Sequence, residues 1–279
     1  MRRLIVNADD FGWTAGINRA VAELHRAGAL DSATLMASGP RLGEAVEVAS
    51  QSPSLGVGCH IVLVDGAPSA DPTSIPSLLS GTRFRTTLGA FVRDLMLGRI
   101  LPANMEREAT AQIRRLQQAG IRVTHIDTHK HTHMFPAVLD AVTRAALTCG
   151  VGAIRNPFEP SWSVAATPAA SPIRRLQVGL LGGFRGHFLR LTRLRDMTTT
   201  DGCMGVLATG SLDAAALHAL VNRMPEGTWE LVCHPAVMDE ELRGARTRLK
   251  ESRVVELEAL RSLPEILPKG IQRIHFGQL

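Results

Sequence analysis

Short apolar runs alternate with longer amphipathic patterns along the whole chain, and this alternation restricts the fold more than any other feature. The apolar runs expected to be strands cover residues 4–6, 33–36, 55–61, 123–126, 152–155 and 229–233. The helical patterns cover residues 16–27, 42–50, 88–97, 105–119, 136–149, 213–222 and 247–260. Strands that alternate with helices predict an α/β fold with a largely parallel sheet.

The length of the chain narrows this choice further. It has 279 residues, no internal repeat and no linker-like segment, so we expect one domain over residues 1–279. A closed or nearly closed (β/α) barrel suits this length, and a doubly wound open sheet fits the alternation almost as well. No GxGxxG or GxxxxGK[ST] motif follows the first strand, which argues against a nucleotide site.

Cysteine spacing and apolar run lengths bear on where the protein works. The four cysteines are widely spaced without a CxxC motif, so we expect free thiols rather than disulfides or a zinc knot. The apolar run after the two N-terminal arginines is too short for a signal peptide, and no run approaches the 18 or so residues of a membrane span. We therefore expect a cytoplasmic protein.

Polar residues stand at the carboxyl ends of the expected strands, where α/β barrels place their active sites. The first strand runs into Asp9 and Asp10, another ends at His60, and the last runs into His234. Taken singly, each has an ordinary structural explanation, such as a turn before a helix or a hydrogen-bonded histidine. Because parallel strands end at the same rim, we expect these side chains to lie together.

A further strand runs into a histidine-rich segment with the sequence HIDTHKHTH. If this segment stays extended, alternate side chains point to the same side of the strand. These side chains are His125, Asp127, His129, His131 and His133. The strand should end near Asp127, so we expect one or two metal ligands here, with the other side chains supporting them. Adventitious metal binding at the surface is the alternative.

These residue types point to a particular chemistry. One carboxylate and two imidazoles with open coordination positions are typical of a catalytic metal site, which lowers the pKa of bound water and polarises a carbonyl oxygen. A second aspartate can then act as general base and another histidine as general acid, a set that hydrolyses an amide or an ester. No GxSxG motif is present, so we do not expect a serine hydrolase.

Four motifs resemble those of the YdjC-like carbohydrate deacetylases, the family of the chitooligosaccharide deacetylases. The motifs are NADDFG at 7–12, GxGxH at 56–60, THIDTHKHTHMFP at 124–136 and CHPA at 233–236, in the family's order. The resemblance implies a distorted TIM-like (β/α) barrel with mostly parallel strands. It also implies metal-dependent removal of the N-acetyl group from an N-acetylglucosamine-type sugar.

The resemblance also implies roles for individual residues. Asp10, His60 and His129 would be the metal ligands. Asp9 would be the general base for a metal-activated water that attacks the amide carbonyl, and His234 the general acid.

The remaining residues of the motifs would support the ligands or contact the sugar, namely His125, Asp127, His131 and His133. Arg155, at the end of the strand expected at 152–155, either hydrogen-bonds sugar or carboxylate groups or is an ordinary surface arginine.

The chain's positive charge is concentrated in residues 160–195, which contain six arginines and no acidic residue. The whole chain has 31 Lys and Arg against 26 Asp and Glu, which leaves 25 basic and 26 acidic groups elsewhere. Apolar residues at 173, 176, 180, 184, 188 and 191 predict an amphipathic helix that four glycines would weaken. The segment is either a membrane-facing lid that admits a lipid-linked sugar or a barrel helix with its apolar face inward.

This middle segment makes the chain look most like the hopanoid-biosynthesis-associated deacetylases. That resemblance implies an N-acetylglucosaminyl hopanoid, a lipid-linked sugar, as the substrate, with soluble chitooligosaccharides as the alternative. The implied partners are an N-acetylated sugar or glycolipid and the inner membrane face, contacted peripherally through residues 173–195. A homodimer remains open.

We expect one divalent metal ion, with zinc favoured and magnesium or another divalent ion as the alternative. Aromatic residues make up 4% of the chain and tyrosine is absent, which argues against a nucleic-acid partner. Two further hypotheses compete with deacetylation. One is an amidase, esterase or phosphoesterase on the same metal, and the other is a basic lipid- or nucleic-acid-binding protein with a structural metal and no hydrolase activity.

Overall fold

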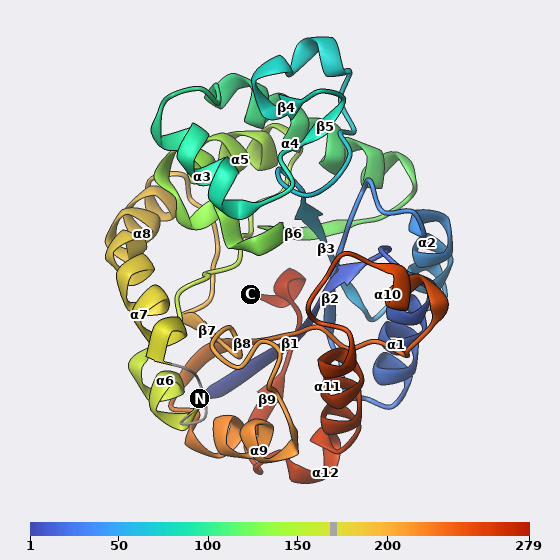
Figure 1. The fold of residues 1–279 in the computed structure, drawn as a ribbon. Helices are drawn as coiled ribbons and strands as arrows, with labels where there is room; N and C mark the ends of the chain where they lie inside the picture. The colour runs from blue at the N-terminus through green and yellow to red at the C-terminus, as the bar shows by residue number, and fades with distance from the viewer. Residues whose placement is uncertain (168–171) are drawn as a thin grey trace.

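A parallel sheet curled into a half-barrel forms the centre of the computed structural model, which describes residues 1–167 and 172–279 (Figure 1). Six strands follow the order β6-β3-β2-β1-β8-β7, and β9 pairs with the start of β1. Their bounds are β1 Arg2–Phe11, β2 Ser32–Leu35, β3 Gly56–Ile61, β6 Val123–Thr128, β7 Gly202–Met204, β8 Gly227–Cys233 and β9 Ile271–Arg273. Every pair in this sheet is parallel, which confirms the predicted α/β class.

The sheet is consistent with the distorted TIM-like barrel that the resemblance implies, but the barrel is not closed. The strand expected at 152–155 makes only isolated bridges, from Ile154 to Ile126 and from Ala153 to Thr198. Continuous hydrogen bonding is therefore interrupted between β6 and β7. A separate antiparallel pair, β4 Leu79–Ser80 and β5 Arg83–Phe84, lies outside the main sheet.

The seven expected helices are present, each within four residues of its predicted ends. They are α1 Ala15–Arg26, α2 Leu42–Ser50, α3 Leu88–Met96, α4 Pro102–Gln118, α5 Pro136–Thr148, α9 Ala214–Arg223 and α11 Glu251–Arg261. Particular residues mark three of these helix ends. Asp213 caps α9 through a 2.8 Å hydrogen bond from the Ala216 amide, Pro136 begins α5, and Gly120 follows α4 with φ of +86°.

The basic segment folds differently from the single amphipathic helix that its spacing predicted. It contains α6 Ser161–Ala166, α7 Pro172–Leu181, a short turn of 3-10 helix at Gly182–Phe184, and α8 Arg185–Leu194. The expected segment also includes residues 168–171, which lie outside the described residues. Two short helices that the sequence did not predict, α10 Glu240–Gly244 and α12 Leu263–Ile266, flank α11.

The C-terminal segment fills the interior of the half-barrel at its amino-terminal end. After β9 the chain turns inward, and its last residues lie at the centre of the ring of strands and helices (Figure 1). Phe276 and Ile274 form a small buried cluster there with Ile5. All four cysteines are free, as expected. Within the described part of the chain, no helix has the length and hydrophobicity needed to cross a bilayer.

Candidate metal centre and active site

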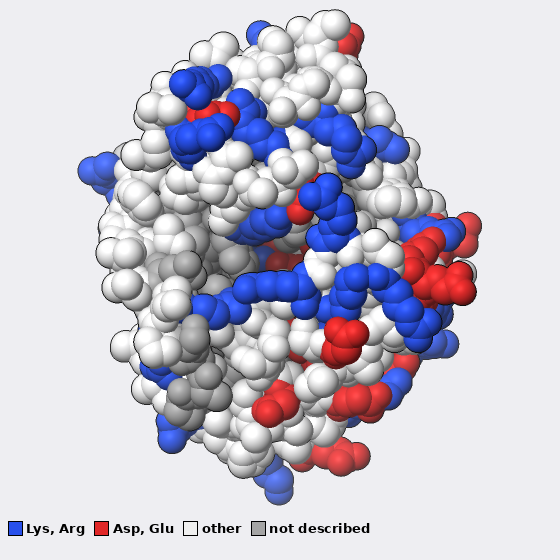
Figure 2. Space-filling view, viewed as in Figure 1, with Lys and Arg blue, Asp and Glu red and all other residues white. Residues whose placement is uncertain are grey.

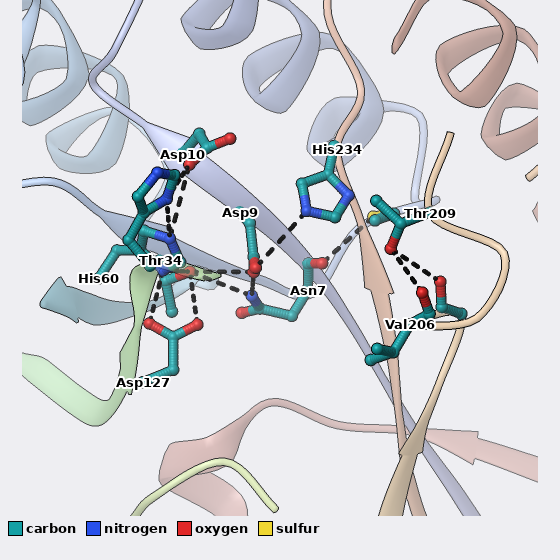
Figure 3. A network of polar contacts seen from close by, with 12 residues as sticks. Asn7, Asp9, Asp10, Thr34, His60, Asp127, Val206, Thr209 and His234 are labelled. Atoms are coloured by element: carbon teal, nitrogen blue, oxygen red, sulfur yellow. Dashed lines mark hydrogen bonds and ion pairs between the residues drawn. The ribbon is translucent and has the colours of Figure 1, made fainter. Parts of the chain in front are cut away.

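The side chains predicted to carry chemistry come together at the carboxyl-terminal rim of the parallel sheet (Figure 3). β1 supplies Asp9 and Asp10, β3 supplies His60, and β6 supplies Asp127. His234 follows β8 directly. Because these strands run in the same direction, residues far apart in sequence lie within one network of polar contacts.

A local irregularity in β1 lets its adjacent aspartates face different partners. The register between β1 and β2 shifts between Ala8 and Phe11, and Asp10 adopts a left-handed conformation with φ of 64°. Aspartate tolerates this conformation better than most residues because its short polar side chain can hydrogen-bond locally. As a result, Asp9 faces Arg155 whereas Asp10 faces His60 and His129.

Three electron-donating atoms form a nearly equilateral triangle at the rim. Asp10 Oδ1 lies 3.5 Å from His60 Nε2 and 3.2 Å from His129 Nδ1, and the two ring nitrogens are 3.3 Å apart. Ligand atoms about 2.1 Å from a tetrahedral metal are separated by roughly 3.4 Å. Asp10 Oδ1 is also buried without a hydrogen-bond partner among the described residues. The geometry therefore fits a metal ion held by Asp10, His60 and His129.

The orientation of His60 is set by Asp127. His60 Nδ1 lies 2.7 Å from Asp127 Oδ1, so that its Nε2 is left facing Asp10 and His129. Burial opposes protonation of this ring, but the Asp127 carboxylate outweighs it and raises the pKa of His60 to about 9. The site thus favours a positive charge at His60, which a metal ion would supply in place of the Nε2 proton.

Arg155 is a buried cation shared by three carboxylates of the network. It is fully buried and contacts three carboxylates: it donates two hydrogen bonds to Asp9, of 2.6 and 2.9 Å, and lies 2.5 Å from Asp127 and 2.7 Å from Glu230. This placement excludes the surface-arginine interpretation. Burial would raise the pKa of Asp9, but Arg155 outweighs it and lowers that pKa, so Asp9 stays ionised. Burial raises the pKa of Glu230 to about 7 despite Arg155.

A second buried arginine, Arg253 of α11, contacts the other side of Asp10. Its Nη2 donates to Asp10 Oδ2, and its guanidinium lies 5.5 Å from the centre of the Trp13 ring. Burial would raise the pKa of Asp10, but Arg253 outweighs it and holds that pKa well below its usual range. Asp10 is therefore ionised, with one oxygen occupied by Arg253 and the other free to bind a cation.

Buried carboxylates outnumber buried guanidinium groups around the rim. The five carboxylates are those of Asp9, Asp10, Asp127, Glu230 and Glu256, and the two arginines contact the first four. Buried negative charge is costly without a cation nearby, so this surplus favours either a protonated His60 or a bound metal ion in its place. A second carboxylate and histidine group, made of Asp9, His60 and Asp127, fits less well because Arg155 already binds both of its carboxylates.

His234 lies beside Asp9 and is positioned by α11. Its Nε2 is 3.8 Å from Asp9 Oδ2, and its backbone amide donates a 2.6 Å hydrogen bond to Glu256. His234 Nδ1 lies 3.7 Å from the same Glu256 carboxylate, which is too long for a hydrogen bond. Asp9 and His234 therefore form a carboxylate and imidazole pair next to the triangle (Figure 3).

His131 and His133 lie outside the triangle because the extended conformation ends at Thr128 and the next residues form a turn, whereas His125 lies earlier, within β6. His125 stacks on Phe276, with ring centroids 3.8 Å apart, and occupies the space left by the missing side chain of Gly58. His133 Nδ1 lies 2.7 Å from Thr128 Oγ1.

His131 is one of four histidines, with His125, His133 and His234, that have a buried ring nitrogen without a hydrogen-bond partner among the described residues. Its Nδ1 is buried and has no hydrogen-bond partner among the described residues. Burial lowers the pKa of His131 to about 3, so the ring is neutral at physiological pH. A neutral imidazole with a free nitrogen can exchange a hydrogen bond with a polar ligand.

Several residues of the network were not predicted from the sequence. The Oγ1 atom of Thr34, in β2, lies 3.2 Å from both Asp9 Oδ1 and Asp127 Oδ2 and can donate its proton to either. Glu230 could have been identified from the sequence, since it is a charged residue inside the otherwise apolar strand WELVC. Arg253 and Glu256 had none, because on an amphipathic helix they look like ordinary surface residues.

Comparisons with known proteins agree with this architecture. A family model described as YdjC-like protein matches residues 3–265. A carbohydrate deacetylase from Brevibacillus brevis is 32% identical over 282 residues, covering 99% of both chains. A chitooligosaccharide deacetylase from Salmonella schwarzengrund is 31% identical, covering 94% of this chain and 91% of the relative.

Solved structures show a similar fold. A putative cellobiose-phosphate cleavage protein from Enterococcus faecalis superimposes with a TM-score of 0.79 at 24% identity, covering 99% of this chain and 98% of that one. A lactam utilization protein from Thermus thermophilus gives a TM-score of 0.51 at 14% identity, covering 98% and 99%.

Proposed function

The chain belongs to the YdjC-like protein family, and from its relatives we infer that it is a carbohydrate deacetylase. We propose that it hydrolyses the amide bond of an N-acetylglucosamine-type sugar with the help of one divalent metal ion. The observation that carries this mechanism is the triangle of Asp10, His60 and His129 beside the Asp9 and His234 pair.

Zinc is the metal that we propose for this site. Two imidazole nitrogens and one carboxylate oxygen suit zinc, whereas magnesium prefers oxygen ligands. When bound, the ion would polarise the acetyl carbonyl and lower the pKa of water. Asp127 and Arg253 serve this site by holding His60 and Asp10 in position.

Asp9 and His234 divide the proton transfers of the reaction. The ionised Asp9 carboxylate accepts a proton from the water whose oxygen bonds to the carbonyl carbon. The bond between that carbon and the sugar nitrogen then breaks, and His234 donates a proton to the leaving amine. The products are acetate and a free amino sugar. Arg155 keeps Asp9 ionised and oriented toward the reacting groups.

We further propose a lipid-linked sugar, of the N-acetylglucosaminyl hopanoid type, as the natural substrate. The basic segment packs directly against the turn that follows His129. The ring centroids of Phe188 and His133 are 6.5 Å apart, and those of Phe184 and Phe135 are 6.0 Å apart. A lipid tail near this segment would lie close to the metal triangle. Soluble chitooligosaccharides are the competing substrates.

Metal analysis combined with acetate release tests the proposal. Replacing His129 with alanine should abolish both metal binding and turnover, because one of three ligands is lost. The Asp9→Asn enzyme should keep its metal but lose about 10²–10⁴-fold in kcat, since it lacks the base while the three ligands remain. The substrates are N-acetylglucosamine, its oligomers and a lipid-linked form, compared at equal concentration.

Asp213→Asn is the matched control, because Asp213 is an exposed helix cap at which asparagine works equally well. It should behave like the wild type. Wild-type turnover in Asp9→Asn would refute Asp9 as the base. Phosphate release from a phosphorylated sugar, without acetate release from the substrates above, would indicate a phosphoesterase instead.

A further inference from the structure

Helix α7 turns three of its apolar residues toward solvent, although Leu181 at its end packs against the core. Ile173, Leu176 and Leu180 are 71%, 64% and 69% exposed, and their spacing of three and four residues puts them on one face. A helix that packs on a protein core normally buries such a face. The later apolar residues of the same predicted pattern are turned inward, since Phe188 of α8 is fully buried.

The arginines of α7 explain this orientation, because they face the protein. Arg174 donates hydrogen bonds of 2.7 and 3.0 Å to the carbonyl oxygens of Thr209 and Val206. Arg175 donates at 2.5 Å to the carbonyl oxygen of Thr167. These bonds orient α7 so that its apolar face points away from the body of the protein.

The neighbouring helix α8 adds positive charge to the same flank. Arg185, Arg190 and Arg193 are exposed, and none of them has an acidic partner within residues 1–167 and 172–279. Figure 1 shows α7 and α8 along one flank of the molecule, and the visible surface there carries no acidic side chain in Figure 2. We call the six side chains the α7–α8 surface, comprising Ile173, Leu176, Leu180, Arg185, Arg190 and Arg193.

We propose that the α7–α8 surface docks on an anionic phospholipid membrane. Exposed leucine and isoleucine side chains can enter the interface between head groups and acyl chains, while arginines bind the lipid phosphates. The proposal concerns where the protein sits and does not depend on the reaction at the metal centre. It would bring the turn carrying His129 near the membrane, because Phe188 of α8 and Phe184 just before α8 pack against His133 and Phe135.

Charge argues for a lipid surface rather than a second copy of the chain. A symmetric dimer through this surface would bring two sets of unpaired arginines together, and like charges oppose such contact. An anionic membrane offers the opposite charge instead. The acid-free composition of residues 160–195 agrees, since one acidic residue would weaken the attraction.

A second exposed apolar surface, at the end of α3, differs from the α7–α8 surface in the pairing of its arginines. Met96, Leu97 and Leu101, at and after the end of α3, are 75%, 58% and 53% exposed. The arginines beside them, Arg93 and Arg99, are both paired with Asp94 at 3.1 and 3.3 Å. This surface has comparable apolar exposure without unpaired arginines, so it serves as the matched control.

Vesicle co-sedimentation tests the proposal with the full chain. Wild-type protein should bind vesicles of phosphatidylglycerol and phosphatidylcholine in equal parts, but not vesicles of phosphatidylcholine alone. The triple variant Arg185→Gln, Arg190→Gln, Arg193→Gln should lose about tenfold or more in partitioning. The triple variant Ile173→Ser, Leu176→Ser, Leu180→Ser should lose about tenfold. The control Met96→Ser, Leu97→Ser, Leu101→Ser should bind like the wild type.

The outcomes separate the alternatives. Acetate release from a soluble substrate by each variant reports folding and activity independently of lipid, and should match the wild type. No wild-type binding to the anionic vesicles would overturn the proposal, as would equal binding by all variants. A dimer in light scattering that the serine variant converts to a monomer would also overturn it, in favour of self-association.

Discussion

Two regions of this protein contain several arginines, and they differ in whether the arginine charges are paired with carboxylates. Around the metal triangle, Arg155 and Arg253 are buried and each contacts at least one carboxylate. On α8, Arg185, Arg190 and Arg193 are exposed without acidic partners among the described residues. Burial makes compensation obligatory because an unpaired charge is costly away from water. Exposure removes that requirement, so charge on α8 stays available for an external partner.

The largest effect expected from this contrast is on stability. Arg155→Met should lower the free energy of unfolding by about 3–5 kcal/mol, because it leaves Asp9, Asp127 and Glu230 without their shared cation. Arg190→Gln on α8 should change it by less than about 0.5 kcal/mol. Urea denaturation measures both, and equal effects would mean that the two regions do not differ as described.

A smaller effect should appear in metal affinity. Arg253→Met should weaken zinc binding about 10- to 100-fold, because Asp10 loses the group that orients it. Arg253→Lys should recover part of this loss by keeping a cation near Asp10 Oδ2. Calorimetric titration of the metal-free protein gives the affinities, and an unchanged affinity in Arg253→Met would exclude the positioning role. The exposed Arg193→Met is the matched control.

A pH-dependent effect on stability should come from Glu230. Its pKa is raised to about 7 in the folded protein from 4.5, so the folded state keeps this proton at a pH where the unfolded state has lost it. The stabilisation is full below about pH 4.5 and disappears as the pH rises through 7. Glu230→Gln cannot ionise, so its unfolding free energy relative to wild type should rise over this window, by roughly 3 kcal/mol at most.

The control for this pH effect is Glu47→Gln, since Glu47 is exposed on α2. Its difference from the wild type should stay constant between pH 4.5 and 7. A constant difference for Glu230→Gln as well would mean that Glu230 ionises normally in the folded protein.

Much of the rim could be predicted because parallel strands deliver their carboxyl ends to one edge. Asp9, Asp10, His60, Asp127 and His234 each stand at or just after an apolar strand, and the structure brings them together. The choice among the clustered histidines needed the turn after Thr128, which separates His129 from His131 and His133. The metal roles themselves remain predictions, to be tested by the variants above.

The orientation of α7 could not be predicted from its sequence. Its apolar spacing is that of a core-facing helix, and only the hydrogen bonds of Arg174 and Arg175 to loop carbonyls turn the apolar face outward. The point at which the barrel fails to close could not be predicted from the sequence either. The sequence of residues 152–155 predicts a strand. In the folded chain these residues form one isolated β-bridge to Ile126 and another to Thr198.

The sequence by itself determined the alternation of strands and helices, the rim at which polar side chains gather, and the family to which the chain belongs. These follow from local patterns, since periodicity and strand-end residues act over a few positions. The tertiary structure decided which charges are compensated and which are not. That depends on partners such as Arg253, which lies 243 residues from Asp10 and meets it only in the folded chain.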